Sequence, residues 1–238
     1  MIRHIPNTLT LLNLMCGFAA TVCAIKCYND YASYCIMTGM VLDFSDGFAA
    51  RLLKAYSALG KDLDSLADMV TFGIAPGSIV FNLLTAGGMT DLKAFAVAVI
   101  VPAASALRLA KFNNDPGQSS SFRGLATPAS AFTVVSVALA AAWTDCRIYD
   151  TMTGSPLFIS LLALFLSVMM LLNARMFSLK FTSLKWKGNE ERLIFVAVSL
   201  LLLAVFRITA LPMIMAAYIL ISFIFPIAAG RRTSSGVM

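Results

Sequence analysis

Charged residues are scarce in this chain. Of its 238 residues, 13% are Asp, Glu, Lys or Arg, whereas a soluble domain usually has about 25%. No polar stretch is long enough to build a separate soluble domain. Because 59% of the residues are hydrophobic and the mean hydropathy is +0.84, the sequence predicts an all-α integral membrane protein. We expect one membrane-embedded domain over residues 1–238, with a short disordered tail at 231–238.

Histidine and paired cysteines are also lacking. His4 is the only histidine, which excludes His-based zinc sites and Ser-His-Asp triads. None of the five cysteines forms a CxxC pair, and cysteine in apolar helices behaves as a small hydrophobe. The net charge of +6 comes without a dense basic tract interleaved with aromatics, so no nucleic-acid partner is expected. Basic loops facing anionic lipid account for that charge.

Apolar stretches of about 20 residues, the length that crosses a bilayer, predict eight helical spans. The distribution of Lys and Arg tests this number. If both termini are cytoplasmic, the opposite side holds only Lys26, Lys93, Arg147 and Arg207 of the 18 basic residues, as the positive-inside rule requires. We expect the protein to lie in the cytoplasmic (inner) membrane, with its active site open to the cytoplasm. The spans are about 6–26, 31–53, 62–86, 91–111, 126–144, 156–174, 191–207 and 210–229, and Gly73, Pro76 and Gly77 are expected to bend the third.

Four aspartates interrupt the second and third predicted spans. An ionised carboxylate near a bilayer core is costly unless it is paired, so such acids are functional candidates. Spacings of i,i+3 and i,i+4 put each pair on one helix face, and two facing pairs surround a common point. Hard oxygen ligands in this number suit Mg²⁺, Mn²⁺ or Ca²⁺ rather than zinc. The acids are Asp43, Asp46, Asp64 and Asp68.

The predicted topology also gives the depth of these acids. At about 1.5 Å per residue they lie roughly 5–16 Å below the cytoplasmic surface, which suggests a pocket open to the cytoplasm. Gly47 and Gly60 lack side chains and let a bulky anion approach the backbone. Arg51, one turn after Gly47, can pair with a phosphate. Asp62 is expected to point away from the site.

A carboxylate cluster with two divalent ions, facing a phosphate, neutralises phosphoryl oxygens and stabilises a leaving group. A remaining carboxylate can deprotonate an attacking hydroxyl. In a membrane, this favours transfer from a diphosphate-linked lipid to a small alcohol.

The run from Asp43 to Asp68 reads DxxDGxxAR-x8-GxxxDxxxD and resembles the signature of the CDP-alcohol phosphotransferase family. The resemblance implies that Asp43, Asp46 and Asp64 bind two Mg²⁺ or Mn²⁺ ions, and that Asp68 both binds metal and acts as general base. It also implies a homodimer. The residues that it places along the CDP moiety are Gly47, Ala50, Arg51 and Gly60.

Residues 5–13, 64–76, 106–113 and 122–129 resemble the membrane-embedded phosphatidylserine synthases of this family, although Lys111 and Ala126 stand where relatives more often carry Arg and Pro. The implied reaction joins CDP-diacylglycerol and L-serine and releases CMP. Asn7 and Thr10 are placed to reach the diphosphate, or alternatively to cap the first helix. The candidates for serine binding are Arg108, Arg123, Lys111 and Asn113.

Two alternatives stay open. The same chemistry with glycerol 3-phosphate or inositol phosphate as acceptor would need further cations for the second phosphate. A divalent-cation transporter would also place carboxylates in a membrane. However, transport needs polar groups along a whole path, and the fifth, sixth and eighth predicted spans have few ionisable residues.

Overall fold

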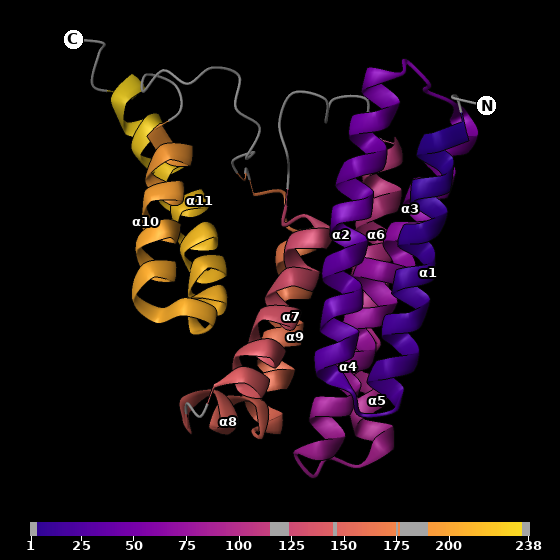
Figure 1. Cartoon of the computed structure of the whole chain (residues 1–238). Coiled ribbons are helices and arrows are strands. Elements are labelled where there is room, and N and C mark those ends of the chain that lie inside the picture. Colours follow the sequence, from indigo (N-terminus) through magenta and orange to yellow (C-terminus); the bar gives the residue numbers. More distant parts are fainter. Residues whose placement is uncertain (1–3, 115–123, 145–146, 175, 177–189, 235–238) are drawn as a thin grey trace.

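The computed structural model describes residues 4–114, 124–144, 147–174, 176 and 190–234. Every regular element in these ranges is helical, which confirms the predicted fold class (Figure 1). The elements are α1 (Ile5–Ile25), α2 (Asn29–Leu52), α3 (Ala58–Asp68), the π-helical turn η2 (Met69–Ile74), α4 (Ala75–Ala86), α5 (Asp91–Ala98), α6 (Ile100–Asn114), α7 (Thr127–Trp143), α8 (Arg147–Thr153), α9 (Pro156–Leu171), α10 (Glu190–Phe206), the 3₁₀ turn η4 (Arg207–Thr209) and α11 (Ala210–Ser234).

Four helical stretches of the described chain are long and apolar enough to cross a membrane, or five if the bent pair α8 and α9 forms one span. They are Ile5–Ile25, Ala58–Ala86, Asp91–Asn114 and Arg192–Ser222. The last stretch doubles back at η4, where Arg207 has a φ of 52°, so α10 and α11 form a hairpin (Figure 1). These findings support an integral membrane protein, and the number of eight spans stays a prediction.

The helix boundaries differ from the prediction at two places, and a third expected feature falls in an unusual element. The third helix begins at Ala58 instead of residue 62, since Ser57 caps it by accepting a hydrogen bond from the amide of Gly60. The expected bend near Gly73 coincides with the π-helical turn η2, and the helix continues into α4. Residues 147–153, expected as part of a loop, form α8, which meets α9 at 75°.

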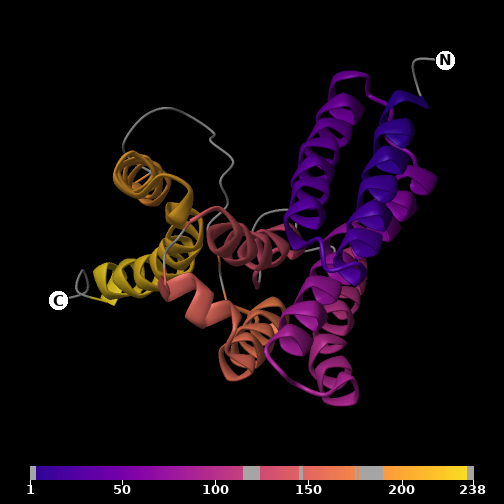
Figure 2. The same cartoon turned by 60° about the horizontal axis from the view of Figure 1, so that its bottom comes forward.

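One core holds α1, α2, η2, α4, α6, α7 and α9 together, with Ile36, Phe72 and Ile79 fully buried in it. A smaller apolar cluster of Phe195, Ala210 and Ile214 holds the α10–α11 hairpin. The hairpin joins the rest of the molecule through α11, which packs against α7 (Figure 2).

The closest packing lies between α1, α2 and η2. A methyl group on Gly17 would lie 2.4 Å from Thr71 Oγ1, and one on Gly39 would lie 2.6 Å from Thr71 Cγ2. Thr71 also donates a hydrogen bond of 3.0 Å to the carbonyl of Asn13. Small residues therefore bring these three helices into contact one turn beyond Asp68, as is common where helices pack in membranes.

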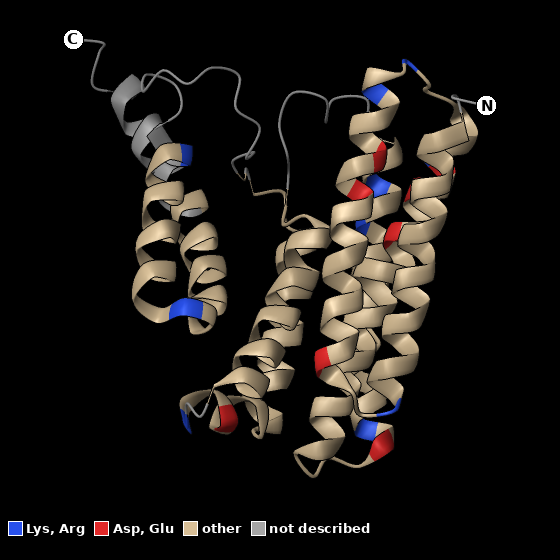
Figure 3. Ribbon diagram, in the orientation of Figure 1, with Lys and Arg blue, Asp and Glu red and all other residues tan. Residues whose placement is uncertain are grey.

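Charged residues are concentrated towards the ends of the helices, while much of the bundle between them is uncharged (Figure 3). The end that carries the turn between α2 and α3 also holds the start of α1 and the end of α6, because Lys61 Nζ donates to the carbonyl of Asn113 at 3.1 Å. The predicted aspartates of α2 and α3 belong to this end.

Candidate active site

Three of the four predicted acids converge. Asp43 of α2 and Asp64 and Asp68 of α3 each offer a carboxylate oxygen within 4.8 Å of the others. The side chains of Asp43 and Asp68 lie within hydrogen-bonding reach of each other. Asp68 Oδ1 is buried and has no hydrogen-bond partner. Like charges held this close repel each other, so the cluster needs protons or cations between its oxygens.

Asp46 lies beside this cluster and has a partner of its own. Its carboxylate is 6% exposed, and Thr10 Oγ1 of α1 lies 2.5 Å from Asp46 Oδ2. The same hydroxyl is 3.0 Å from the carbonyl of Pro6; having one proton, it donates to one acceptor at a time. Asp46 still interacts electrostatically with Asp43, Asp64 and Asp68. Thus the structure brings three carboxylates into a single group and places the fourth next to it, held by α1.

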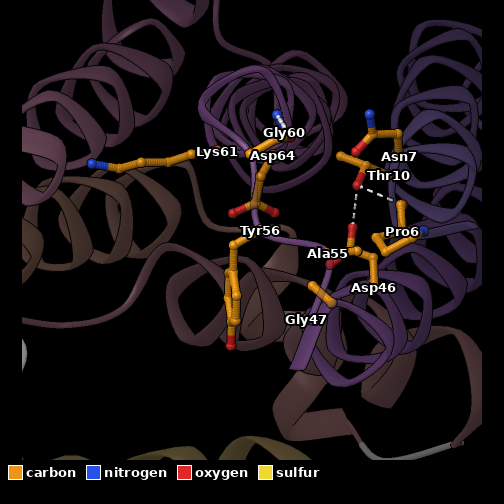
Figure 4. A pocket seen from close by; sticks show the side chains of 12 residues that line it. Pro6, Asn7, Thr10, Asp46, Gly47, Ala55, Tyr56, Gly60, Lys61 and Asp64 are labelled. Atoms are coloured by element: carbon orange, nitrogen blue, oxygen red, sulfur yellow. Dashed lines mark hydrogen bonds between the residues drawn. The ribbon is translucent and has the colours of Figure 1, made fainter. Parts of the chain in front are cut away.

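A cavity of about 210 Å³ opens beside these acids, between α1, α2 and the start of α3 (Figure 4). Asp46 and Asp64 both line it, from opposing helices. Lys61 also lines it, but its ammonium group extends away from the acids to the carbonyl of Asn113 (Figure 4). The lining residues are Pro6, Asn7, Thr10, Asp46, Gly47, Ala50, Ala55, Tyr56, Ser57, Gly60, Lys61 and Asp64.

The two signature glycines have different surroundings. A methyl group on Gly47 would meet no atom within 4 Å, so it would project into open space at the cavity wall. A methyl group on Gly60 would lie 3.0 Å from Ser57 Oγ and 3.2 Å from Asn7 Oδ1. The absence of a side chain at Gly47 therefore leaves room for a ligand, whereas at Gly60 it also lets α3 approach α1.

Most of the predicted CDP contacts line the cavity. Asn7, Thr10, Gly47, Ala50 and Gly60 do so. The alternative that Asn7 or Thr10 caps the first helix is wrong, because α1 begins at Ile5 with His4 as its N-cap residue.

Arg51 differs from the other predicted CDP contacts. Its side chain is exposed and is not part of the cavity lining, and its Nε donates to the carbonyl of Gly47 at 2.9 Å. It therefore folds back along its own helix. A rotation of this exposed side chain would be needed for it to reach a phosphate.

The candidates for serine binding do not form one group. Arg108 is buried, at 7% exposure, and its guanidinium interacts electrostatically with Asp68. Asn113 donates to Ser65 Oγ at 2.8 Å, and Lys111 is exposed. Arg123 lies outside the described residues.

Five lining residues have no counterpart in the sequence prediction: Pro6, Ala55, Tyr56, Ser57 and Lys61. Four of them belong to the turn between α2 and α3 or to its edge. A serine directly before a predicted helix is an N-cap signal, and this signal would have located Ser57. Asp62 is exposed and does not line the cavity, in agreement with its predicted place outside the site.

The residues fit a divalent cation. Three carboxylate oxygens lie close together, one oxygen of Asp68 is buried without a partner, and hard oxygen ligands of this kind suit Mg²⁺ or Mn²⁺. Asp43, Asp64 and Asp68 could hold one ion between them. Asp46, at the edge of the cavity, is placed to bind a second ion or the same one.

Similar proteins from three organisms carry the same name. A protein of Bacillus subtilis named CDP-diacylglycerol--serine O-phosphatidyltransferase is 36% identical over 136 residues, covering 56% of this chain and 74% of that protein. Proteins of the same name from Helicobacter pylori and Saccharomyces cerevisiae are 31% identical over 223 residues and 34% identical over 151 residues. The Helicobacter match covers 92% of this chain and 89% of the relative, and the yeast match covers 57% and 53%.

The model of the CDP-alcohol phosphatidyltransferase family matches residues 3–172. This range contains all four aspartates, the cavity and the helices α1 to α9 that form the main core. Since the match covers well over half of the chain and includes the whole acidic site, the protein belongs to the CDP-alcohol phosphatidyltransferase family.

Proposed function

We propose that this protein is a phosphatidylserine synthase, which transfers the phosphatidyl group from CDP-diacylglycerol to the hydroxyl of L-serine and releases CMP. The observation that carries the proposal is the convergence of Asp43, Asp64 and Asp68 beside a cavity. Gly47 leaves open space at the wall of that cavity. The names of the relatives from Bacillus, Helicobacter and yeast support serine as the acceptor.

The cavity suits the cytidine diphosphate part of the donor. Gly47 leaves open space at the cavity wall, and Lys61 would supply a positive charge for a phosphate oxygen after its ammonium group releases the carbonyl of Asn113. Thr10 holds Asp46 in place, so that the carboxylate faces the cavity in one orientation. Arg51 reaches the diphosphate after releasing the carbonyl of Gly47. In this arrangement the diphosphate lies between the two acidic helices.

The reaction then needs an attacking oxygen and a leaving group. Two divalent ions bound by Asp43, Asp46, Asp64 and Asp68 would neutralise the phosphoryl oxygens and stabilise the departing CMP. The free oxygen of Asp68 accepts the proton of the serine hydroxyl, and the serine oxygen forms a bond to the phosphorus that carries the lipid. The bond from that phosphorus to the oxygen of CMP breaks, and CMP leaves with the bonding electrons.

We also propose that the active site opens to the cytoplasm, in a protein that crosses the inner membrane eight times and has both termini inside. The support is the position of 14 of the 18 Lys and Arg residues on one side of the predicted topology. Labelling of single cysteines from either face of right-side-out vesicles tests this, and labelling of a cysteine placed at residue 56 from outside would contradict it. The homodimer implied by the family resemblance belongs to the same proposal, and light scattering of the detergent complex measures it.

The experiment that tests the reaction is CMP release by purified protein in detergent micelles, with CDP-diacylglycerol and Mg²⁺ or Mn²⁺. L-Serine, glycerol 3-phosphate and inositol 1-phosphate are offered separately. We expect release to require serine and to fall by a factor of about 10²–10⁴ in Asp68→Asn, the usual contribution of a general base. Asp62→Asn is the matched control, because Asp62 is on the same helix and outside the cavity.

The other outcomes are equally informative. Release with glycerol 3-phosphate or inositol 1-phosphate in place of serine would keep the chemistry and replace the acceptor. Equal activity of Asp68→Asn and Asp62→Asn would remove Asp68 from the mechanism. Release with none of the acceptors, from folded protein with metal present, would contradict the proposed reaction.

A further inference from the structure

We propose that Arg108 and Tyr218 form the subsite that binds the α-carboxylate of the acceptor amino acid. This inference rests on the proposed function and adds a residue from a part of the chain that the family model does not match. Tyr218 lies on α11, whereas the match ends at residue 172. The C-terminal hairpin would thus contribute to the choice of acceptor.

Arg108 has two buried donor atoms that no group of the described residues pairs with. It is 7% exposed, and its Nε and Nη2 atoms are buried and have no hydrogen-bond partner. These two nitrogens share one edge of the guanidinium, the edge that donates two parallel hydrogen bonds to a carboxylate. Leaving a buried charged group unpaired is costly, so a ligand for this edge is expected. Arg108 is the one Lys or Arg that is buried among the described residues.

Asp68 is near Arg108 but does not satisfy it. The two groups interact electrostatically, yet Asp68 Oδ1 and the two guanidinium nitrogens all remain without a partner. An acceptor and two donors thus lie in one neighbourhood without bonding to each other. L-Serine has complementary groups at a short separation: a carboxylate for the Arg108 guanidinium and a hydroxyl for Asp68. Bound in this way, it would present its hydroxyl to the proposed base.

Tyr218 of α11 is a second neighbour of Arg108. Its side chain interacts electrostatically with Arg108 and packs both on the main core and on the hairpin cluster. Its ring also meets Phe195 of α10 edge-on, with 5.7 Å between the centroids. A phenol next to the guanidinium can donate a hydrogen bond to a carboxylate that the guanidinium holds. Packing on two clusters fixes its position.

The chemistry also bears on the alternative, phosphorylated acceptors. A phosphate monoester carries more negative charge than a carboxylate and would call for more than one cation. The described residues supply one buried guanidinium and a neutral phenol here. A singly charged carboxylate matches this pair.

The test compares Tyr218→Phe and Arg108→Lys with Tyr149→Phe in the full-length protein. The control removes a hydroxyl that donates to the carbonyl of Thr209 at 2.8 Å, which ties the turn of the same hairpin to α8. It loosens the hairpin without changing the subsite. Thermal unfolding in detergent verifies that each variant is folded.

We expect Tyr218→Phe to raise the KM for L-serine about tenfold and Arg108→Lys to raise it about a hundredfold, as for lost hydrogen bonds to a charged group. The KM for CDP-diacylglycerol should stay unchanged. L-Alanine, which has the carboxylate and no hydroxyl, should inhibit both variants more weakly by the same factors. L-Alaninamide, which lacks the carboxylate charge, should inhibit the wild type and Tyr218→Phe equally.

An unchanged serine KM in Tyr218→Phe would overturn the inference, as would an equal rise in Tyr149→Phe, which would assign the effect to the hairpin's position. In both cases wild-type release of CMP with serine would leave the proposed function intact. If the wild type used a different acceptor instead, the serine reaction and the carboxylate subsite would fail together.

Discussion

Replacing Gly47 by alanine should separate ligand binding from stability. Gly47 is in the interior of α2, where glycine costs about 0.5–1 kcal/mol relative to alanine. Because an added methyl group would meet no atom within 4 Å, Gly47→Ala should gain this free energy. For a chain of this size, the gain corresponds to a rise in Tm of about 1–4 °C. Glycine at this cavity wall makes the protein less stable than alanine would, which indicates that a ligand occupies the space beside it.

The same methyl group should weaken the binding of the donor. Overpacking a well-fitted contact costs about 1–3 kcal/mol, and this corresponds to a rise in the KM for CDP-diacylglycerol of about 5–150-fold. CMP release in mixed micelles, with the lipid donor varied at saturating serine, measures it. The KM for serine should not change.

Ser45→Ala is the matched control, since Ser45 is on the same helix and does not line the cavity. It should leave both KM values at the wild-type level. If Gly47→Ala raised Tm and kept its donor KM within about twofold of the wild type, the cavity at Gly47 would not be where the donor binds. A fall in Tm would show instead that Gly47 is required for packing.

Three further perturbations test other parts of the structure. Gly17→Ala should lower the stability by about 1–3 kcal/mol, seen as a lower Tm in detergent, because its methyl group would lie 2.4 Å from Thr71 Oγ1; an unchanged Tm would contradict the packing of α1 on η2. Thr10→Val removes the hydrogen bond to Asp46 and should reduce kcat/KM about tenfold, with Tm as the check on folding and Thr8→Val, on the exposed face of α1, as the control. Chelation with EDTA should abolish CMP release and lower Tm, since a bound ion stabilises the folded state by mass action; Mg²⁺ or Mn²⁺ should restore both, and activity that survives dialysis against the chelator would refute a metal role for the cluster.

The convergence of the acids was predictable because it follows mainly from the spacing of neighbouring residues in the sequence. Helical spacing of i,i+3 and i,i+4 places two acids on one face, and adjacent antiparallel helices bring two faces together. The structure brings Asp43, Asp64 and Asp68 together, and their role as metal ligands stays a prediction. Asp46 was predicted to join them but lies beside this group, and its partner Thr10 is 36 positions earlier in the chain. That contact depends on how α1 packs on α2, and no local spacing encodes it.

The parts of the site that escaped prediction depend on non-local packing or on a turn. Tyr56 lines the cavity because α2 ends at Leu52 and the chain turns before α3. An apolar run with few breaks gives little information about where such a turn begins. Tyr218, which we propose for the acceptor subsite, was not predicted either, because a tyrosine in an apolar stretch has no informative spacing to the acidic residues. Its place became evident only from the packing of the hairpin on the core.

The close packing of α1, α2 and η2 has a direct bearing on the chemistry. Three carboxylates held together repel each other, and this repulsion is stronger where water is scarce. A flexible backbone would relieve it by moving the acids apart. Here Gly17, Gly39 and Thr71 bring α1, α2 and η2 into close contact one turn from Asp68, and moving the helices apart would lose this packing and the hydrogen bond from Thr71 to Asn13. Small residues outside the signature thus hold the acids in a preorganised arrangement. The binding of metal and substrate then does not have to bring the acids together.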